Sequence, residues 1–416
     1  YDTIIDATNS HVYPGIIVRF VSADESFQIY DGGGSSFQLR TNRVFRDPSA
    51  WYHLVIAVDT TDATSGDRIK MYINGTRETS FQTANYPSQN YDTGFNNGLE
   101  LNIAREAGQS NYFDGYMSDV VVVDGTALTP TSFGETDSNG VWIPKNISGI
   151  TFGTCGFHLD FSDGADLGND ISGNNNDFTE NNITSVSKSL DIPQNNYATF
   201  NPLAPMVHKL EDGNLKIDGQ DQNWDSAFST IGASSGKWYM EMKFISLHGG
   251  LVRAAMGLVD ARDQTLMATN EVGYNITGTV GDSVGYNGNG TSNNVKKNDA
   301  NQYSAGVAWV ANDIIAMAVD LDNGAVYFRI NDNSWLNSGN PESGASRTGA
   351  VTITTGETYV FGATAYGTST DFEFNWGAPS FAITSSNSDA NGHGSFEYAV
   401  PSGYFALNTK NLAEHG

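Results

Sequence analysis

The stretch 158–178 is dense in the oxygen ligands that bind Ca²⁺. It reads HLDFSDGADLGNDISGNNNDF. Calcium takes about six to eight oxygen ligands, and we expect them among these side chains: Asp160, Asp163, Asp166, Asp170, Asn174 and Asp177. The spacing lacks the glycine and the closing glutamate of an EF-hand loop. The alternative is a run of turns, because Asp and Asn bond their own backbone. Beyond Ca²⁺ the sequence indicates no cofactor.

Residues for hydrolytic chemistry are not arranged as catalysis requires. Retaining glycan-cleaving enzymes place two carboxyl groups about 5 Å apart. A Glu-x-Asp-x-x-Glu strand can supply them, and none occurs here. Glu241 has no acidic partner on its own face of the expected strand 235–244. The sequence also has no His-Glu-x-x-His helix, no phosphate-binding loop and no nucleophile elbow in a strand-to-helix setting. We therefore expect no catalysis.

Binding is the remaining role, and sugar sites need an aromatic ring with polar groups at its rim. Aromatic residues in expected turns are the candidates: Tyr86, Tyr91, Phe95, Tyr112, Tyr286, Tyr303 and Trp335. We single out four of them as ligand-binding: Tyr112, Tyr286, Tyr303 and Trp335. For each, the alternative is a core or ordinary surface residue, because isolated exposed apolar groups are normal.

Composition limits the classes of protein. The chain has 416 residues, enough for two domains of roughly 200 residues each. The formal charge of −26 and the pI near 4.3 disfavour direct nucleic-acid binding, because an acidic surface repels phosphates. Cys155 is the only cysteine, so no intrachain disulfide forms. The sequence has no long apolar run, so we expect no membrane insertion.

Two similar stretches indicate how these residues are positioned. Residues 51–75 read WYHLVIAVDTTDATSGDRIKMYING, and residues 313–332 read DIIAMAVDLDNGAVYFRIND. Each has an apolar run ending in Val-Asp, a polar turn and a second run ending in Ile-Asn. Because the second runs alternate apolar and polar side chains, each stretch predicts a β-hairpin. We therefore expect an all-β protein of two tandem sandwiches, with a short helix at 405–414 and little other helix.

The first half carries motifs that resemble a known family. They run from 45 to 203 and read FRDPSAWYH, FDGY, ALTP, SFGET, WIPK and NNYATFNPL. These motifs resemble laminin-G-like, concanavalin A-like sandwiches of jelly-roll type in tail-fibre and other structural proteins of tailed phages, often from marine hosts. Members of this family often bind Ca²⁺. They usually have further strands before the position of Tyr1, so we expect a processed or longer chain.

The second half resembles another concanavalin-like sandwich. Its motifs are SGKWYME, GLV, VGY, DIIAMAVDLDNGAVYF, FNWG and PSGY. These motifs are similar to those of the SPRY domain, which binds ligands through loops at one end, here 261–270, 281–302 and 331–347. We therefore place the domains at 1–204 and 205–416, with the boundary near Pro205. The usual Asn-Gly after the hairpin is Asn331-Asp332 here, so a different turn is expected.

These resemblances imply a virion structural protein such as a tail fibre, appendage or capsid decoration. Its non-catalytic sandwiches would bind host-surface glycans or proteins, or other virion subunits. It would be made in the host cytoplasm and lie on the virion surface. Fibres are commonly homotrimers, although no coiled-coil heptad occurs here. The alternatives are a purely architectural virion protein without a ligand, a secreted extracellular lectin or adhesin, and, disfavoured by the missing carboxylate pair, a glycan-cleaving enzyme.

Overall fold

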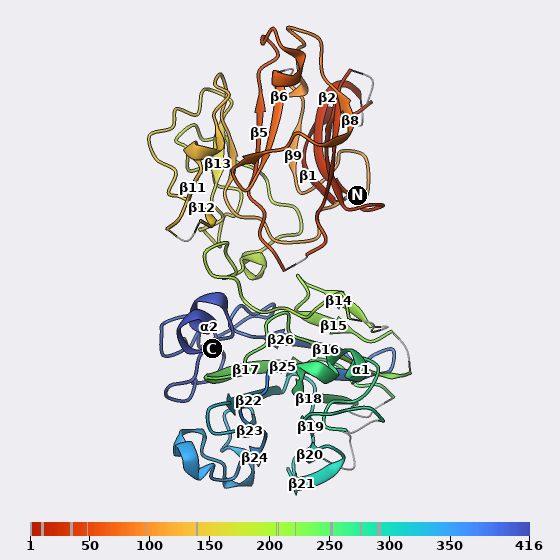
Figure 1. Ribbon diagram of the computed structural model, residues 1–416, viewed down its shortest axis with the longest axis vertical. Coiled ribbons are helices and arrows are strands. Elements are labelled where there is room, and N and C mark those ends of the chain that lie inside the picture. The colour runs from red at the N-terminus through yellow and green to blue at the C-terminus, as the bar shows by residue number, and fades with distance from the viewer. Residues whose placement is uncertain are drawn as a thin grey trace. The chain divides into compact units, whose positions relative to one another are not determined.

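The computed structural model contains two compact units (Figure 1), and we describe each by itself. They comprise Tyr1–Asn182 and Ile183–Gly416. The described residues are 2–9, 12–33, 36–47, 49–96, 98–138, 140–204, 206, 208–220, 222–249, 253–274, 277–288 and 293–416. Three residues of the sequence argument, Tyr1, Pro48 and Pro205, lie outside them, as do residues 289–292 of the expected loop 281–302.

The first unit is built on a six-stranded and a three-stranded antiparallel sheet. The six-stranded sheet has the order β8 (Phe81–Asn85), β4 (Gln38–Val44), β3 (Ser26–Tyr30), β2 (Val12–Val21), β1 (Asp2–Asn9) and β9 (Leu101–Ile103). The other sheet contains β5 (Leu54–Val58), β6 (Ile69–Ile73) and β7 (Thr76–Arg77). Two small ladders follow: β10 (Val120–Val122) with β13 (Phe157–Leu159), and β11 (Gly134–Thr136) with β12 (Trp142–Pro144).

The core of the first unit lies between these two sheets. Apolar side chains of β2, β3 and β4 pack against Ile69, Met71 and Ile73 of β6. All three β6 residues are buried, whereas the intervening Lys70 and Tyr72 are half-buried. This alternation is the one that the sequence predicts for the face of a sheet that covers a core. The first unit is thus a β-sandwich.

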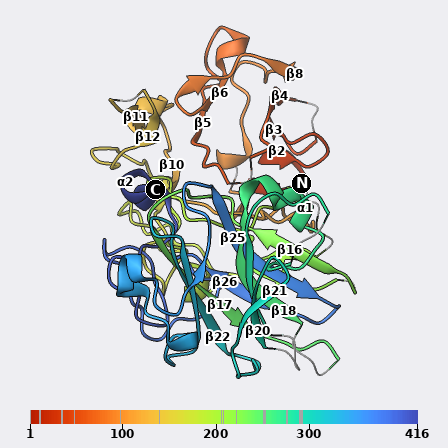
Figure 2. The same cartoon turned by 60° about the horizontal axis from the view of Figure 1, so that its bottom comes forward.

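The second unit is a sandwich of a seven-stranded and a six-stranded antiparallel sheet (Figure 2). One sheet has the order β14 (Lys209–Glu211), β15 (Lys216–Asp218), β26 (Phe372–Asn375), β17 (Lys237–Phe244), β22 (Ile314–Asp320), β23 (Ala325–Ile330) and β24 (Val351–Thr352). The other has the order β16 (Trp224–Phe228), β25 (Tyr359–Tyr366), β18 (Ala254–Asp260), β19 (Ser283–Asn287), β20 (Asn294–Lys297) and β21 (Ala300–Ser304). Helix α1 (Gln264–Met267) follows β18. The predicted all-β class is confirmed.

Both predicted hairpins form, and an asparagine follows the second strand of each. β5 pairs with β6, and β22 pairs with β23. Asn74 and Asn331 take positive φ angles of 47° and 52°. Each side-chain carbonyl accepts a backbone N–H on the first strand's side, from His53 at 2.8 Å and from Ile314 at 3.0 Å. The side-chain amide oxygen therefore explains why the two stretches share this asparagine.

The turns after the two asparagines differ, as the sequence led us to expect. Gly75 also has a positive φ, of 75°, so Asn74 and Gly75 form a tight turn into β7. Two successive positive φ angles are typical of a type I′ hairpin. Asp332 does not take a positive φ, because a side chain makes that conformation costly. The chain after β23 therefore does not turn back at once, and β24, which pairs with β23, begins only at Val351.

Central strands of the second unit are buried on both faces. In β22, Ile315, Met317 and Val319 face the core between the sheets. The intervening Ala316 and Ala318 face an outer layer of aromatic residues. This layer comprises Tyr197, Tyr239, Tyr327, Phe396 and Tyr404. Small alanines on the outer face leave room for these rings. They also leave room for the C-terminal segment, residues 396–407, which carries Phe396 and Tyr404.

The chain divides earlier than the sequence-based boundary at 204/205. Tyr197 belongs to the outer layer of the second unit, and Phe200 lies in its main core. The backbone N–H of Ala198 donates to the carbonyl of Leu407 at 3.0 Å. Residues 195–200 therefore pack with the second unit because they pair with the C-terminal segment. The sequence-based boundary placed them in the first sandwich, since an extended stretch does not identify its partner.

The predicted terminal helix is shorter than expected. α2 spans Thr409–His415, and Asn408 caps it by accepting the N–H of Asn411 at 2.9 Å. Residues 404–407 are not helical, and Tyr404, Ala406 and Leu407 are buried in the second unit.

The carboxylate of Glu241 holds the C-terminal segment on the outer face of the seven-stranded sheet. Glu241 is fully buried. One carboxylate oxygen accepts the N–H of Tyr398 and the hydroxyl of Tyr239, both at 2.9 Å. The other oxygen accepts the N–H of Glu397 at 2.9 Å. Burial raises the pKa of Glu241, and the hydrogen bonds oppose that rise.

Arg329 extends this network to the edge of the aromatic layer. Its guanidinium donates to the Tyr239 hydroxyl at 3.0 Å and to the carbonyl of Ala399 at 2.9 Å. The same group lies 4.9 Å from the ring centroid of Trp335 and 5.5 Å from that of Tyr398. Residues 397–399 are thus fixed from two strands, β17 and β23.

We expect Glu241→Ala to lower the free energy of unfolding by about 2–4 kcal/mol. The substitution leaves the N–H groups of residues 397 and 398 buried without acceptors, and each unsatisfied group costs about 1–3 kcal/mol. Urea unfolding of the full chain measures the change. Glu25→Ala, at an exposed glutamate, is the control and should cost less than about 0.5 kcal/mol. Equal stability of the two variants would contradict this role.

Candidate functional site

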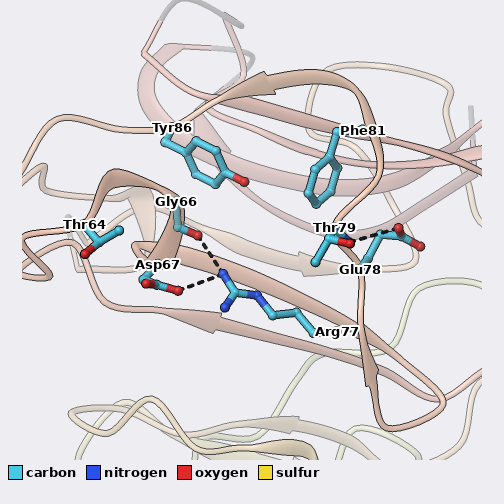
Figure 3. A pocket seen from close by; sticks show the side chains of 8 residues that line it. All are labelled: Thr64, Gly66, Asp67, Arg77, Glu78, Thr79, Phe81 and Tyr86. Atoms are coloured by element: carbon cyan, nitrogen blue, oxygen red, sulfur yellow. Dashed lines mark hydrogen bonds and ion pairs between the residues drawn. The ribbon is translucent and has the colours of Figure 1, made fainter.

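A shallow depression of about 400 Å³ lies in the first unit (Figure 3). Its lining comes from the 3-10 turn Ser65–Asp67, from β7 and from β8. The lining residues are Thr64, Gly66, Asp67, Arg77, Glu78, Thr79, Phe81 and Tyr86. β7 and β8 are terminal strands of the two sheets, so the depression lies at the edge of the sandwich.

One side of the depression is aromatic and the other is polar. Phe81 and Tyr86 are half-buried, and both pack against the core. Figure 3 shows their rings on the side opposite the pair formed by Arg77 and Asp67. The core thus holds both rings in place while part of each stays exposed.

The charged groups of the depression are paired. Arg77 contacts the Asp67 carboxylate at 2.8 Å and donates to the carbonyl of Gly66 at 2.8 Å. Glu78, only 9% exposed, accepts the N–H groups of Thr79 and Ser80 at 3.0 and 2.9 Å. Its other oxygen lies 3.0 Å from Arg43 Nε. These contacts orient the side chains before any ligand binds.

Sequence reasoning found only one side chain of this site. Tyr86 was among the exposed aromatic candidates, but its partners were not identified. The polar partners come from a turn and a two-residue strand, which have no periodic pattern. A usable signal was the order Asn-Gly, Arg77-Glu78, Phe81 and Tyr86, in which a hairpin turn places charges beside two aromatic residues.

The predicted Ca²⁺ residues are used for turns and loop contacts. Asp170 accepts the N–H groups of His158, Ser172 and Asn176 at 2.8–2.9 Å. Burial would raise its pKa, but these bonds outweigh burial, and its pKa is lowered. Asp160 and Asp163 each accept the N–H two residues later, at 3.0 and 2.9 Å. Such contacts agree with the alternative of Asx turns.

The remaining predicted ligands fall into two groups. Asp177 accepts the N–H of Asp170 at 2.9 Å, and the Asn174 amide donates to the carbonyl of Gly156 at 2.8 Å. The pKa of Asp166 is raised by desolvation and then by the nearby charges of Glu180, Asp177 and Asp163. Among the described residues, no group of three or more His, Cys, Asp or Glu is placed to hold a metal. A Ca²⁺ site here stays a prediction.

The four predicted ligand-binding aromatics are not brought together. Tyr112 belongs to the first unit and is 59% exposed. Tyr286 is fully buried in β19, where its ring packs 5.0 Å from that of Trp309. The expectation that Tyr286 lies in an exposed turn is therefore wrong. All five residues of β19 are buried, and Val284 and Tyr286 both belong to the core. We misinterpreted the neighbouring glycines as a sign of a loop.

The other two aromatics are half-buried in the second unit. Tyr303 pairs with Val295 across β20 and β21, and burial raises the pKa of its hydroxyl. Trp335 packs beside Tyr327, with ring centroids 6.4 Å apart. A ligand-binding role for these residues stays a prediction.

Two of the three loops expected to bind ligands are joined to each other. The buried Asp263 carboxylate, in loop 261–270, accepts the N–H of Gly281 at 2.8 Å. Loop 331–347 packs on the outer face of the seven-stranded sheet, where Ser343 Oγ lies 3.3 Å from the Tyr327 hydroxyl. This third loop is therefore part of the outer layer.

A buried carboxyl group that sequence reasoning missed lies beside β19. Glu271 is 6% exposed, and burial raises its pKa to about 8. Lys296 and hydrogen bonds from Tyr274 and Asn287 oppose this rise, whereas Asp299 adds to it. Lys296 also donates to the Tyr274 hydroxyl. No local pattern in the sequence distinguishes this glutamate from an exposed one.

Comparisons with known proteins agree with the sandwich fold. Residues 1–132 match the profile of the Concanavalin A-like lectin/glucanases superfamily. None of the curated proteins matches the chain.

The described residues contain no helix that is long and apolar enough to cross a membrane.

Solved structures similar to this chain include SPRY domains. The SPRY domain of human HERC1 has 13% identity and a TM-score of 0.32, and the match covers 42% of this chain and 96% of that one. A human SPRY domain has 13% identity and a TM-score of 0.28, with 42% and 97% covered. Stonustoxin has 17% identity and a TM-score of 0.30, with 43% of this chain and 27% of its own covered.

We expect Asp170→Asn to lower the free energy of unfolding by about 1–3 kcal/mol at pH 7, because one acceptor oxygen becomes a donor that faces an N–H. Since the folded-state pKa of Asp170 is lowered, its stabilisation is present above the unfolded pKa and lost as the pH falls. The difference between the two chains should therefore shrink at pH 3. Urea unfolding at both pH values measures it, and a difference that grows in acid would contradict the assignment.

Glu271 should make stability fall as the pH rises. Its folded-state pKa is raised from 4.5 to about 8, so its stabilisation is complete below pH 4.5 and is lost as the pH rises through about 8. We expect Glu271→Gln to be more stable than the parent at pH 9 by roughly 3–5 kcal/mol. Below pH 4.5 the two should be nearly equal. Urea unfolding between pH 4 and 9 measures the free energy of unfolding of both chains. If this free energy changes with pH in the same way in both, the burial of a carboxyl group here is contradicted.

Proposed function

We propose that this chain is a structural protein of a phage virion, with non-catalytic sandwiches that bind glycans of the host surface. The observation that carries the binding role is the edge depression, where two aromatic rings face a set of paired polar groups. Supporting the virion context is the resemblance of the motifs at 45–203 to tail-fibre and other phage structural proteins. Carboxylates in the depression are held by cations or backbone N–H groups. Their side chains are therefore already oriented when a ligand binds.

Such a protein would act by holding rather than by reacting. A shallow site with few polar contacts gives weak binding for each copy. Several copies on one particle would raise the overall avidity by a large factor without new contacts. We therefore propose display on the virion surface, with host glycans and other virion subunits as the partners, and a homotrimer as one way to present several copies.

A second candidate is a purely architectural role in the particle. The observation that favours this role is that β7 and β8 are edge strands. Each pairs with a neighbour on one side only within its sheet. An edge strand presents N–H and C=O groups that can pair with a strand of another chain. Under this candidate the partner is a neighbouring virion subunit, and no glycan is bound.

Imaging of intact particles tests the virion context. We expect antibodies against the full chain to label the surface of particles made from the genome that encodes it. Particles lacking the chain should remain unlabelled and serve as the control. If the label is found only in the extracellular fraction, the protein is a secreted lectin or adhesin, and the proposal fails.

A further inference from the structure

We propose that the depression between β7 and β8 binds a neutral, hydroxyl-rich saccharide and excludes anionic glycans. This inference rests on the binding role proposed above and adds the chemical class of the ligand. It follows from the balance of charge around the site, from the donors that remain there and from the aromatic side.

The charge around the depression disfavours an anionic ligand. The chain as a whole has 21 basic and 47 acidic side chains, so an anionic glycan would need a local excess of cations. The depression and its ion pairs supply equal numbers of each sign, three cations with three anions: Arg43, Lys70 and Arg77 with Asp62, Asp67 and Glu78. Because no positive charge is in excess, a sulfate or carboxylate would enter a site that the surrounding field already disfavours.

Hydrogen-bond donors and acceptors line the depression. Arg77 uses only Nη2 for Asp67 and Gly66, and within the described residues Nε and Nη1 have no partner. The Asp67 carboxylate and the exposed side chains of Thr64 and Thr79 lie beside them. Donors and acceptors are thus both present in the lining. A sugar hydroxyl both donates and accepts, so neighbouring hydroxyls satisfy such a set in pairs.

The aromatic side of the depression favours a ligand with an apolar face. Phe81 and Tyr86 face the polar pair across the depression (Figure 3). The apolar C–H face of a pyranose ring can cover these rings while its hydroxyls point to Arg77 and Asp67. A ligand with one apolar face and a hydroxylated rim fits both sides at once, and a fully polar anion does not.

Binding of the full chain to a panel of immobilised glycans tests the proposal. The panel holds neutral oligosaccharides of hexose and N-acetylhexosamine, and anionic ones with sulfate, uronate or sialate groups. We expect binding to neutral members that changes little between 50 and 500 mM NaCl, because no ion pair with the ligand is screened. Tyr86→Ala and Arg77→Ala should each weaken that binding about tenfold or more. Arg46→Ala is the matched control, since this exposed arginine pairs with Glu25, and its binding should equal that of the parent.

Asp67→Asn tests the charge balance directly. It removes the anion that neutralises Arg77, so the variant should bind sulfated or uronate glycans that the parent rejects, and this gain should vanish at high salt. Thermal unfolding of every variant, compared with the parent, separates loss of the site from loss of the fold.

The outcomes separate this inference from the function proposed above. Binding to anionic glycans alone would overturn the neutral class and leave the glycan-binding role standing. Neutral binding unchanged in both Tyr86→Ala and Arg77→Ala would overturn the assignment of the site. No binding to any glycan by a folded chain would end both, and would favour the architectural candidate.

Discussion

The central strands of the seven-stranded sheet are buried on both faces, and the second unit covers the outer face with its own C-terminal segment. A strand whose two faces are both apolar or small cannot face water on either side. β22 alternates large side chains toward the core with Ala316 and Ala318 toward the outer layer. The layer stays in place because the Glu241 carboxylate accepts two of its backbone N–H groups. A buried polar group thus fixes the position of an otherwise apolar layer.

Local regularities were predictable from the sequence, and long-range partners were not. Alternation in residues 69–73 and 325–330 identifies the hairpins, because side chains of a strand point to opposite faces in turn. The repeated asparagine also marks a physical role, since Asn74 and Asn331 each bond the backbone of the partner strand. Residues 195–200 could form an extended stretch in either unit. Only their pairing with residues near 407 assigns them to the second unit.

The candidate site was predictable only in part, for a related reason. Tyr86 could be recognised as an aromatic residue near a turn, but Arg77 and Asp67 meet only because β7 folds back along β6 toward the turn that precedes it. Tyr286 shows the opposite error, since glycines beside an aromatic suggested a loop where a buried strand lies. For the Asp-rich stretch, composition alone left ion binding and turns open, and the hydrogen bonds of Asp170 show how much of it serves turns.

The position of the outer layer also has a consequence for biosynthesis. Glu397 bonds Glu241 across 156 positions of the chain, and the residues near 407 pair with those near 198. Residues 237–244 therefore leave the ribosome long before their outer cover is made, with Tyr239 and its neighbours still open to water. The first unit draws its contacts from residues up to 182 and can complete its sheets during translation. We expect the nascent second half to need protection from aggregation in that interval.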